Sequence, residues 1–267
     1  MASLAVIRAQ VESRLPGALT VYERAAHEVF PTGIAALDRH IGGIPQSALT
    51  QFCTPAGMSS GKTSLLVSLM SQMTRREQFC ALVDAGDCFD PSSAEPAGVN
   101  LARLLWIRCG NSVCASIPER TPSARSGDLA ARRKLSPLEQ AFKAADILVQ
   151  NGGFSLIAVD LGNVEEKLVR KVPLTTWFRF ARVIEKMPAA LLFLMPFPAA
   201  QSCAGLTLHL ACAEPRWSAM KNQETKQISH AQFFAGLLCE AEIGRSRLRK
   251  PMQSANGARF TAIPRWA

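Results

Sequence analysis

The segment AGMSSGKT at residues Ala56–Thr63 is the most informative part of this sequence for its fold. The residues before it, Ala48–Cys53, form a candidate strand, and Ser64–Thr74 repeats apolar residues at the spacing of a helix. A loop of small residues between a strand and a helix leaves its backbone N–H groups free to surround phosphate oxygens, and the helix adds its positive N-terminal end. The pattern therefore predicts a phosphate-binding loop of the nucleotide-binding type.

Within this loop, each residue type suggests a role. We expect Gly61 to allow close approach of the backbone, Lys62 to reach the outer phosphates and the hydroxyl of Thr63 to coordinate Mg²⁺. The alternative is a relic loop that keeps its shape but binds no nucleotide. The residues expected to contact the nucleotide here are Ala56, Gly57, Met58, Ser59, Ser60, Gly61, Lys62, Thr63 and Ser64.

Such a site also requires an acidic residue at the end of a buried strand, because that residue holds Mg²⁺ through water. Asp160 closes the apolar run FSLIAVD and is the candidate for this metal-binding role. Asp84 closes FCALVD in the same manner. For either aspartate, the alternative is that it merely ends its strand.

Strands and helices alternate along the chain, which predicts an α/β fold with a mostly parallel twisted sheet flanked by helices. Thr32 is expected to cap the helix in PTGIAALDRHIGG, and Ser136 with Glu139 forms a predicted capping box. Another helix is expected over Leu174–Lys186. The other expected strands are Phe79–Asp84, LLWIR within Leu101–Arg108, Phe154–Asp160, Ala189–Met195 and Leu206–Cys212.

The chain is expected to consist of one core with an extension at each end. Residues 1–30 are predicted as an N-terminal helical extension, residues 31–213 as the nucleotide-binding core and residues 214–267 as a basic C-terminal extension. Leu206–Cys212 is expected to be the last strand, because the residues near the C-terminus are basic and rich in Pro and Gly, with little periodicity.

The chain has 30 basic and 21 acidic residues, and its net charge of +9 favours a polyanionic partner such as nucleic acid. A basic surface can also serve solubility alone, so the charge leaves both interpretations open. Contacts with DNA phosphates would be salt-sensitive and independent of sequence, whereas a solvated or protein-binding tail is the alternative. The candidates for DNA contact are Arg125, Arg132, Arg133 and Lys134 in a polar loop and Arg245, Arg247, Arg249 and Lys250 near the C-terminus.

The eight cysteines include no CxxC pair, so we expect reduced thiols in an intracellular protein rather than zinc ligands. The N-terminal residues lack a signal-peptide pattern, and no apolar stretch is long enough to span a membrane. The chain is therefore expected to be cytoplasmic.

At several collinear places, the residues resemble those of the RecA recombinase family. The similarity spans Pro31–Ala213 and rests on PTGIAALDRHIGGIPQSALTQF, PAGMSSGKTSL, CALVDAGDCFDPSSAEPAGVNLARLLW and GGFSLIAVD. Several collinear motifs are more specific than the phosphate-binding loop alone. The short length and the missing RecA C-terminal domain are more similar to the ImuA branch, whose members are RecA-like accessory proteins of damage-induced mutagenesis.

The resemblance implies a RecA-like P-loop NTPase core that binds ATP and Mg²⁺ and acts in DNA repair of the SOS-type translesion kind. It implies single-stranded or primer–template DNA and repair or translesion polymerases as partners, and it allows a homo-oligomer. It also implies that Asp90 lies on the adenine side of the site, where Ser93 replaces the family's stacking tyrosine.

Departures from the family pattern affect catalysis and sensing. The family places a catalytic glutamate two residues after the aspartate that ends the second strand, and here that position is Gly86, which cannot polarise an attacking water. Met195-Pro196 replaces the Asn-Gln pair that senses the γ-phosphate and links it to the DNA-binding loop. That loop also looks shortened, because Ser202–Leu208 soon rejoins a strand. We therefore expect nucleotide binding with slow or absent turnover.

Two other functions stay open. The chain could be a DNA-dependent ATPase of homologous recombination, with Asp87 as the nearby candidate base, although its side chain is expected to point elsewhere. It could also be a scaffold that binds no nucleotide. DNA-stimulated hydrolysis would favour the ATPase, and the lack of an ATP-induced rise in melting temperature would favour the scaffold.

Overall fold

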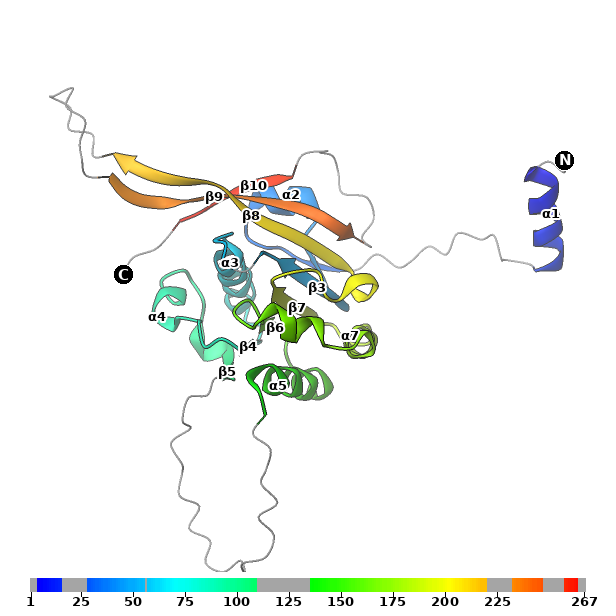
Figure 1. Ribbon diagram of the computed structural model, residues 1–267, viewed down its shortest axis with the longest axis horizontal. Helices are drawn as coiled ribbons and strands as arrows, with labels where there is room; N and C mark the ends of the chain where they lie inside the picture. Colours follow the sequence, from blue (N-terminus) through cyan, green and yellow to red (C-terminus); the bar gives the residue numbers. More distant parts are fainter. Residues whose placement is uncertain are drawn as a thin grey trace, which may run out of the picture.

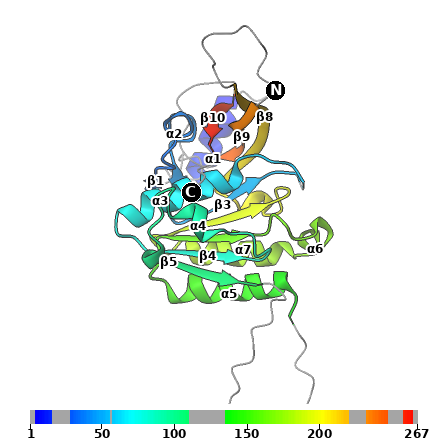
Figure 2. The same cartoon turned by 90° about the vertical axis from the view of Figure 1, so that its left-hand side faces the viewer.

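Eight strands form the main sheet, in the order β10-β9-β8-β3-β7-β6-β4-β5. The computed structural model describes residues 4–15, 28–55, 57–109, 135–219, 232–246 and 257–263. The strands follow one another in Figure 2 from β10 at the top to β5 near the bottom. Their bounds are β3 (Ala48–Cys53), β4 (Cys80–Asp84), β5 (Leu104–Arg108), β6 (Leu156–Asp160), β7 (Ala190–Met195), β8 (Leu206–Ala219), β9 (Gln232–Ser246) and β10 (Ala258–Ala262).

Strands β8 to β5 pair in parallel, whereas β9 and β10 are added antiparallel at one end. Every residue of β3, β4 and β7 is buried. Burial on both faces explains why β4 and β7 read as apolar runs rather than as alternating patterns, whereas β3 also buries the polar residues Thr50 and Gln51. The predicted α/β fold with a mostly parallel sheet is confirmed.

Helices cover both faces of the sheet. On one face α2, α3 and α4 pack through residues that include Leu37, Leu69 and Ala94. On the other face α5 and α7 pack through residues that include Ala145 and Trp177. The bounds are α2 (Ala35–Ile41), α3 (Lys62–Arg75), α4 (Pro91–Ala94), α5 (Pro137–Asn151) and α7 (Leu174–Ile184).

Shorter elements complete the described structure. The helix expected within residues 1–30 is present as α1, and nearly all of its described residues are exposed. The bounds of these elements are α1 (Leu4–Arg14), β1 (Val29–Phe30), β2 (Ile44–Pro45), η1 (Leu101–Arg103), α6 (Glu166–Arg170) and η2 (Gln201–Cys203). Within the described residues, no helix is long and apolar enough to cross a membrane.

The two predicted helix caps have different outcomes. The capping box at α5 is confirmed, because the Ser136 hydroxyl accepts a hydrogen bond from Glu139 N and the Glu139 carboxylate accepts one from Ser136 N. The prediction that Thr32 caps α2 is wrong: the N-cap residue is Ile34, which has no side-chain cap. Thr32 instead donates to the Asp38 carboxylate through its backbone N–H and its hydroxyl, so this carboxylate secures the approach to the helix.

The prediction that Leu206–Cys212 is the last strand is wrong. The strand continues as β8 to Ala219, and β9 and β10 follow it in the same sheet. Figure 1 shows β8 and β9 extending beyond α3 as a long twisted ribbon. Register shifts interrupt this pair at three places, and Pro215 lies within β8, so the two-residue periodicity that reveals a strand is broken. The expected core boundary at residue 213 therefore falls inside a strand.

Candidate functional site

The predicted phosphate-binding loop connects the carboxyl end of β3 to the start of α3. Gly57 and Gly61 have φ angles of 76° and 72°, which glycine adopts without the steric cost of a side chain. The buried hydroxyls of Thr54 and Ser60 hydrogen-bond at 2.7 Å across the base of the loop. Residues 57–59 are exposed above this base, and α3 follows with the positive end of its dipole toward the loop.

Lys62 extends from the first turn of α3 to the residues that follow β6. A Cβ placed on Gly162 would lie 1.9 Å from Lys62 Nζ and 3.0 Å from Asp160 Oδ1. The ammonium group and the carboxylate therefore lie on either side of a glycine that has no side chain to separate them. The sequence predicted Lys62 and Asp160 as parts of one site, and the structure brings them together. The role of Gly162 was missed, since no motif marks it.

The Asp160 carboxylate is anchored and shielded. Its Oδ1 accepts a hydrogen bond from Gly162 N at 2.8 Å. Burial raises the pKa of Asp160 above its usual value; the Gly162 N–H and the charge of Lys62 oppose the rise, and the charge of Asp84 adds to it. A cation bound here would favour the ionised carboxylate. Thr63, the other predicted metal ligand, lies exposed in the first turn of α3, as does Ser64.

The carboxylate of Asp84 is hydrogen-bonded to the backbone of the loop that follows its strand. It is aligned with Asp160 across the parallel pair β4–β6, and it is almost fully buried. Its carboxylate accepts hydrogen bonds from the backbone N–H groups of Gly86, Cys88 and Phe89 at 3.2, 2.9 and 2.8 Å. These three bonds favour the interpretation of Asp84 as a structural residue that fixes the turn after its strand.

The space beside Gly86 is filled. A Cβ on Gly86 would lie 3.0 Å from the Cβ of Asn163 and 3.3 Å from the Sγ of Cys88. The Asn163 side-chain amide donates to the same sulfur at 2.8 Å. The position at which the resemblance places a catalytic glutamate therefore lacks a carboxylate and is also closed by its neighbours.

Asp87 points away from this position, as expected from the sequence. Both of its carboxylate oxygens accept from Arg108, at 2.5 and 2.6 Å, and the arginine also lies over the Trp106 ring at 4.9 Å. Hydrogen bonding to Asp87, followed by the attraction between the two charges, raises the pKa of Arg108. A carboxylate bound in this bidentate way is poorly placed to accept a proton from water.

Asp90 caps α4. Its carboxylate accepts from the backbone N–H groups of Ser92 and Ser93 at 3.0 and 3.2 Å. Hydrogen bonding from the Ser93 side chain, followed by that from the Ser92 backbone, lowers the pKa of Asp90. The Ser93 hydroxyl in turn donates to the backbone carbonyl of Asp90 at 3.1 Å. Asp90 is exposed, but the helix cap already uses both oxygens of its carboxylate.

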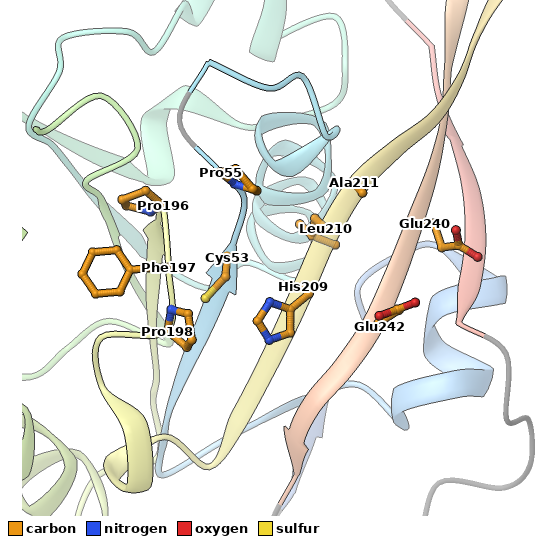
Figure 3. Close-up of a pocket in the computed structure, with 10 residues that line it drawn as sticks. All are labelled: Cys53, Pro55, Pro196, Phe197, Pro198, His209, Leu210, Ala211, Glu240 and Glu242. Carbon is orange, nitrogen blue, oxygen red and sulfur yellow. The ribbon is translucent and has the colours of Figure 1, made fainter. Parts of the chain in front are cut away.

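The segment after β7 begins with Pro196, and its one side-chain amide, that of Gln201, lies exposed at the start of η2. A shallow cavity of about 410 Å³ separates the start of the phosphate-binding loop from this segment and the outer strands. Figure 3 shows Pro196, Phe197 and Pro198 on one side and residues of β8 and β9 on the other. The residues that line it are Cys53, Pro55, Pro196, Phe197, Pro198, His209, Leu210, Ala211, Glu240 and Glu242.

A buried glutamine holds the same segment in place. Gln51 on β3 donates from Nε2 to the Thr207 hydroxyl at 2.8 Å and accepts from Ala200 N at 3.2 Å. Arg170 of α6 lies over the Phe197 ring at 4.3 Å, which links the segments after β6 and β7. The whole connection from β7 to β8 covers residues 196–205, consistent with the short loop expected from the sequence.

The C-terminal strands pack directly against the phosphate-binding loop. A Cβ on Gly61 would lie 2.6 Å from Cys239 Sγ and 3.4 Å from both the Ala262 Cβ and the Phe260 ring. This contact was missed because residues 214–267 were expected to be an extension outside the core. The sequence gives no local signal for it, since the pairing joins segments far apart in the chain.

Several predicted site residues lie outside the described part of the structure. Among the candidates for DNA contact, only Arg245 is described, and it is exposed on β9. The predicted residues outside the described ranges are Ala56, Arg125, Arg132, Arg133, Lys134, Arg247, Arg249 and Lys250.

Comparisons with known proteins agree with this geometry. Residues 17–114 match the family model of the RecA N-terminal domain. The chain is 33% identical over 135 residues to the protein RecA of Methylococcus capsulatus, covering 50% of this chain and 31% of that protein. It is 33% identical over 140 residues to the protein RecA of Leifsonia xyli, covering 52% of this chain and 31% of that protein. The chain thus spans about a third of the length of the curated relatives it matches.

Proposed function

Because this chain belongs to the RecA family through its phosphate-binding region, we propose that it binds ATP with Mg²⁺, hydrolyses it slowly or not at all, and acts in DNA repair. More specifically, we propose an accessory role in SOS-type translesion mutagenesis, similar to that of the ImuA branch. In this role the protein would act through DNA and through repair or translesion polymerases.

One contrast supports this proposal: the groups that would bind phosphate and metal are assembled, whereas the catalytic position is filled. Lys62 and Asp160 lie on either side of Gly162 beside the loop. Asn163 occupies the space next to Gly86, where a catalytic carboxylate would be needed. A site of this composition favours nucleotide binding over turnover.

The residues present fit a bound nucleotide. The backbone N–H groups of residues 57–61 and the start of α3 would surround the phosphates, and Lys62 would contact the outer ones. Thr63 and Asp160 would hold Mg²⁺, which supplies positive charge between the phosphate oxygens. The raised pKa of Asp160 suits such a site, because binding the cation would relieve the cost of keeping the buried carboxylate ionised.

The rival proposal, a DNA-dependent ATPase of recombination, requires a base. Asp87 is the carboxylate nearest in sequence, and its bidentate pairing with Arg108 argues against that role. The scaffold with a relic loop stays the second alternative, and nucleotide binding distinguishes it from the proposal.

The test is thermal unfolding of wild type and Lys62→Ala with ATP and Mg²⁺, with phosphate release followed in parallel with and without single-stranded DNA. The proposal expects a higher melting temperature in wild type only, with little phosphate release. At ATP concentrations about 100 times the dissociation constant, binding would stabilise the native state by ~2.7 kcal/mol. Strong DNA-stimulated release would replace the proposal by the ATPase, and no shift in wild type would favour the scaffold.

A further inference from the structure

Two cysteines face each other across the strands that brace the phosphate-binding loop. Cys212 on β8 and Cys239 on β9 are direct partners in the antiparallel register. Directly opposed residues of an antiparallel pair project from the same face of the sheet. Their Cα atoms are about 4.5–5.5 Å apart in such pairs, within the range of about 4.4–6.8 Å that a disulfide spans. Both thiols are free.

This pair lies on the face of the sheet that packs on α3. Leu208 and Leu210, which precede Cys212 at two-residue spacing, belong to the core cluster that contains the α3 side chains, as does Cys239. The Sγ of Cys239 also packs directly against Gly61. The shallow cavity in Figure 3 is lined by His209 and Ala211 of β8 and by Glu240 and Glu242 of β9, which alternate with the residues of the Cys212 face, and Leu210 contributes at its edge. The cavity therefore opens mainly on the opposite face of these strands. The thiol pair thus belongs to the wall of the phosphate-binding loop.

We propose that Cys212 and Cys239 form an intramolecular disulfide when the protein meets a peroxide, and that this bond loosens the phosphate-binding loop. The half-buried Cys212 reacts first, since its sulfur is the more accessible of the two. Its thiolate attacks one peroxide oxygen, which gives a sulfenic acid and one water. The sulfur of Cys239 then displaces the second water and loses its proton. Overall, two thiols and hydrogen peroxide give one disulfide and two waters.

The environment of Cys239 supports this order of steps. Burial, together with the nearby Cys212, raises the pKa of the Cys239 thiol to about 11, which leaves little thiolate to react directly with peroxide. The Cys239 sulfur would nevertheless be within reach of a sulfenic acid formed on Cys212 of the opposite strand. By contrast, the exposed Cys88 has no cysteine as its strand partner, because it lies in the turn after β4.

The disulfide would change the wall of the loop. Directly opposed residues hold their Cβ atoms about 4.5–5.5 Å apart, whereas a disulfide requires about 3.5–4.5 Å. The strands must therefore draw together locally, and the Cys239 sulfur must turn toward Cys212 and away from Gly61. Losing this contact would leave a void beside the residue that precedes Lys62.

The cross-link is tested by treating the full chain with hydrogen peroxide and mapping its peptides by mass spectrometry under non-reducing conditions. Wild type and Cys88→Ser should yield the peptide linked through Cys212 and Cys239, whereas Cys212→Ser and Cys239→Ala should not. In the same samples, amide hydrogen exchange of residues 57–65 should become faster in oxidised wild type and stay unchanged in Cys212→Ser. A reductant should reverse both changes.

Failure to link while Cys212 is trapped as a sulfenic acid would overturn the cross-link, and so would links formed only between two chains. A link without faster amide exchange would overturn its effect on the loop. A weaker ATP-induced rise in melting temperature after oxidation is also expected, and this last consequence rests on the proposed function. If reduced wild type shows no ATP response, the proposed function fails, whereas peptide mapping and amide exchange still decide the disulfide.

Discussion

Replacing Gly162 with alanine tests whether Lys62 interacts with Asp160 in the absence of nucleotide and with phosphate when nucleotide binds. The backbone of Gly162 is outside the left-handed region, so alanine can adopt it, but the added Cβ would lie 1.9 Å from Lys62 Nζ. The ammonium group must then move by about 1.5 Å to reach an ordinary contact distance. It moves away from Asp160, which loses part of its charge partner in the protein without nucleotide.

The size of this effect follows from Coulomb's law. Opposite charges about 4 to 5 Å apart attract by ~4 kcal/mol at an effective dielectric constant of about 20, and an extra ~1.5 Å removes ~1 kcal/mol of this. Lys62 is only half-buried, so solvent screening reduces the loss to about 0.5–1 kcal/mol. For a chain of this size, that lowers the melting temperature by about 1–4 °C.

Bound nucleotide should reverse the loss. If Lys62 leaves Asp160 to contact phosphate, alanine at position 162 weakens only the protein without ligand. The ATP-induced rise in melting temperature should therefore be larger in Gly162→Ala than in wild type, by the same amount that the unliganded melting temperature fell. Differential scanning calorimetry with and without ATP and Mg²⁺ measures both quantities.

A double-mutant cycle provides the control. In the Lys62→Ala background no ammonium group is left to displace, so Gly162→Ala should have little further effect. An equal fall in melting temperature with and without ATP, or equal destabilisation by Gly162→Ala in the Lys62→Ala background, would show that the added Cβ does not act through Lys62.

Three further predictions concern the neighbouring carboxylates and the filled catalytic position. Gly86→Glu alone should leave phosphate release unchanged because Asn163 blocks the new side chain, whereas Gly86→Glu with Asn163→Gly should release more; equal rates would contradict this. The pKa of Asp160 is raised in the folded protein, so protonation of this carboxyl group stabilises the folded state. This stabilisation is complete at pH values below the usual carboxyl pKa and is lost as the pH rises through the pKa of Asp160 in the folded protein. Asp160→Asn should therefore have a higher melting temperature than wild type near pH 7, and the difference between the two melting temperatures should shrink as the pH is lowered. A difference that calorimetry finds to be independent of pH would contradict this prediction. Asp87→Ala should lower stability only slightly, because the Arg108 side chain of this pair is exposed to solvent, and it should leave phosphate release unchanged; a loss of DNA-stimulated release would identify Asp87 as a base.

The centre of the fold can be predicted from the amino-acid sequence. The apolar runs of β4, β6 and β7 are long because these strands are covered on both faces. The helices between the strands show helical periodicity, and α5 also shows its capping box in the sequence. The phosphate-binding loop was visible because glycines and small residues must occupy fixed positions between a strand and a helix. Lys62 and Asp160 could be assigned to one site since both follow the carboxyl ends of parallel strands.

The residues that surround the phosphate-binding loop, in contrast, depend on how distant strands pair. Asn163 reaches the space beside Gly86 because β4 and β6 are neighbours in the sheet, although the two residues are far apart in the chain. Cys239 lies on Gly61 because β9 returns antiparallel along β8, through bulges that hide the strand periodicity. Local sequence fixes the conformation of short segments through sterics and hydrogen bonds. It carries no comparable signal for contacts that depend on which distant segments pair, and those contacts determine what the phosphate-binding loop packs against.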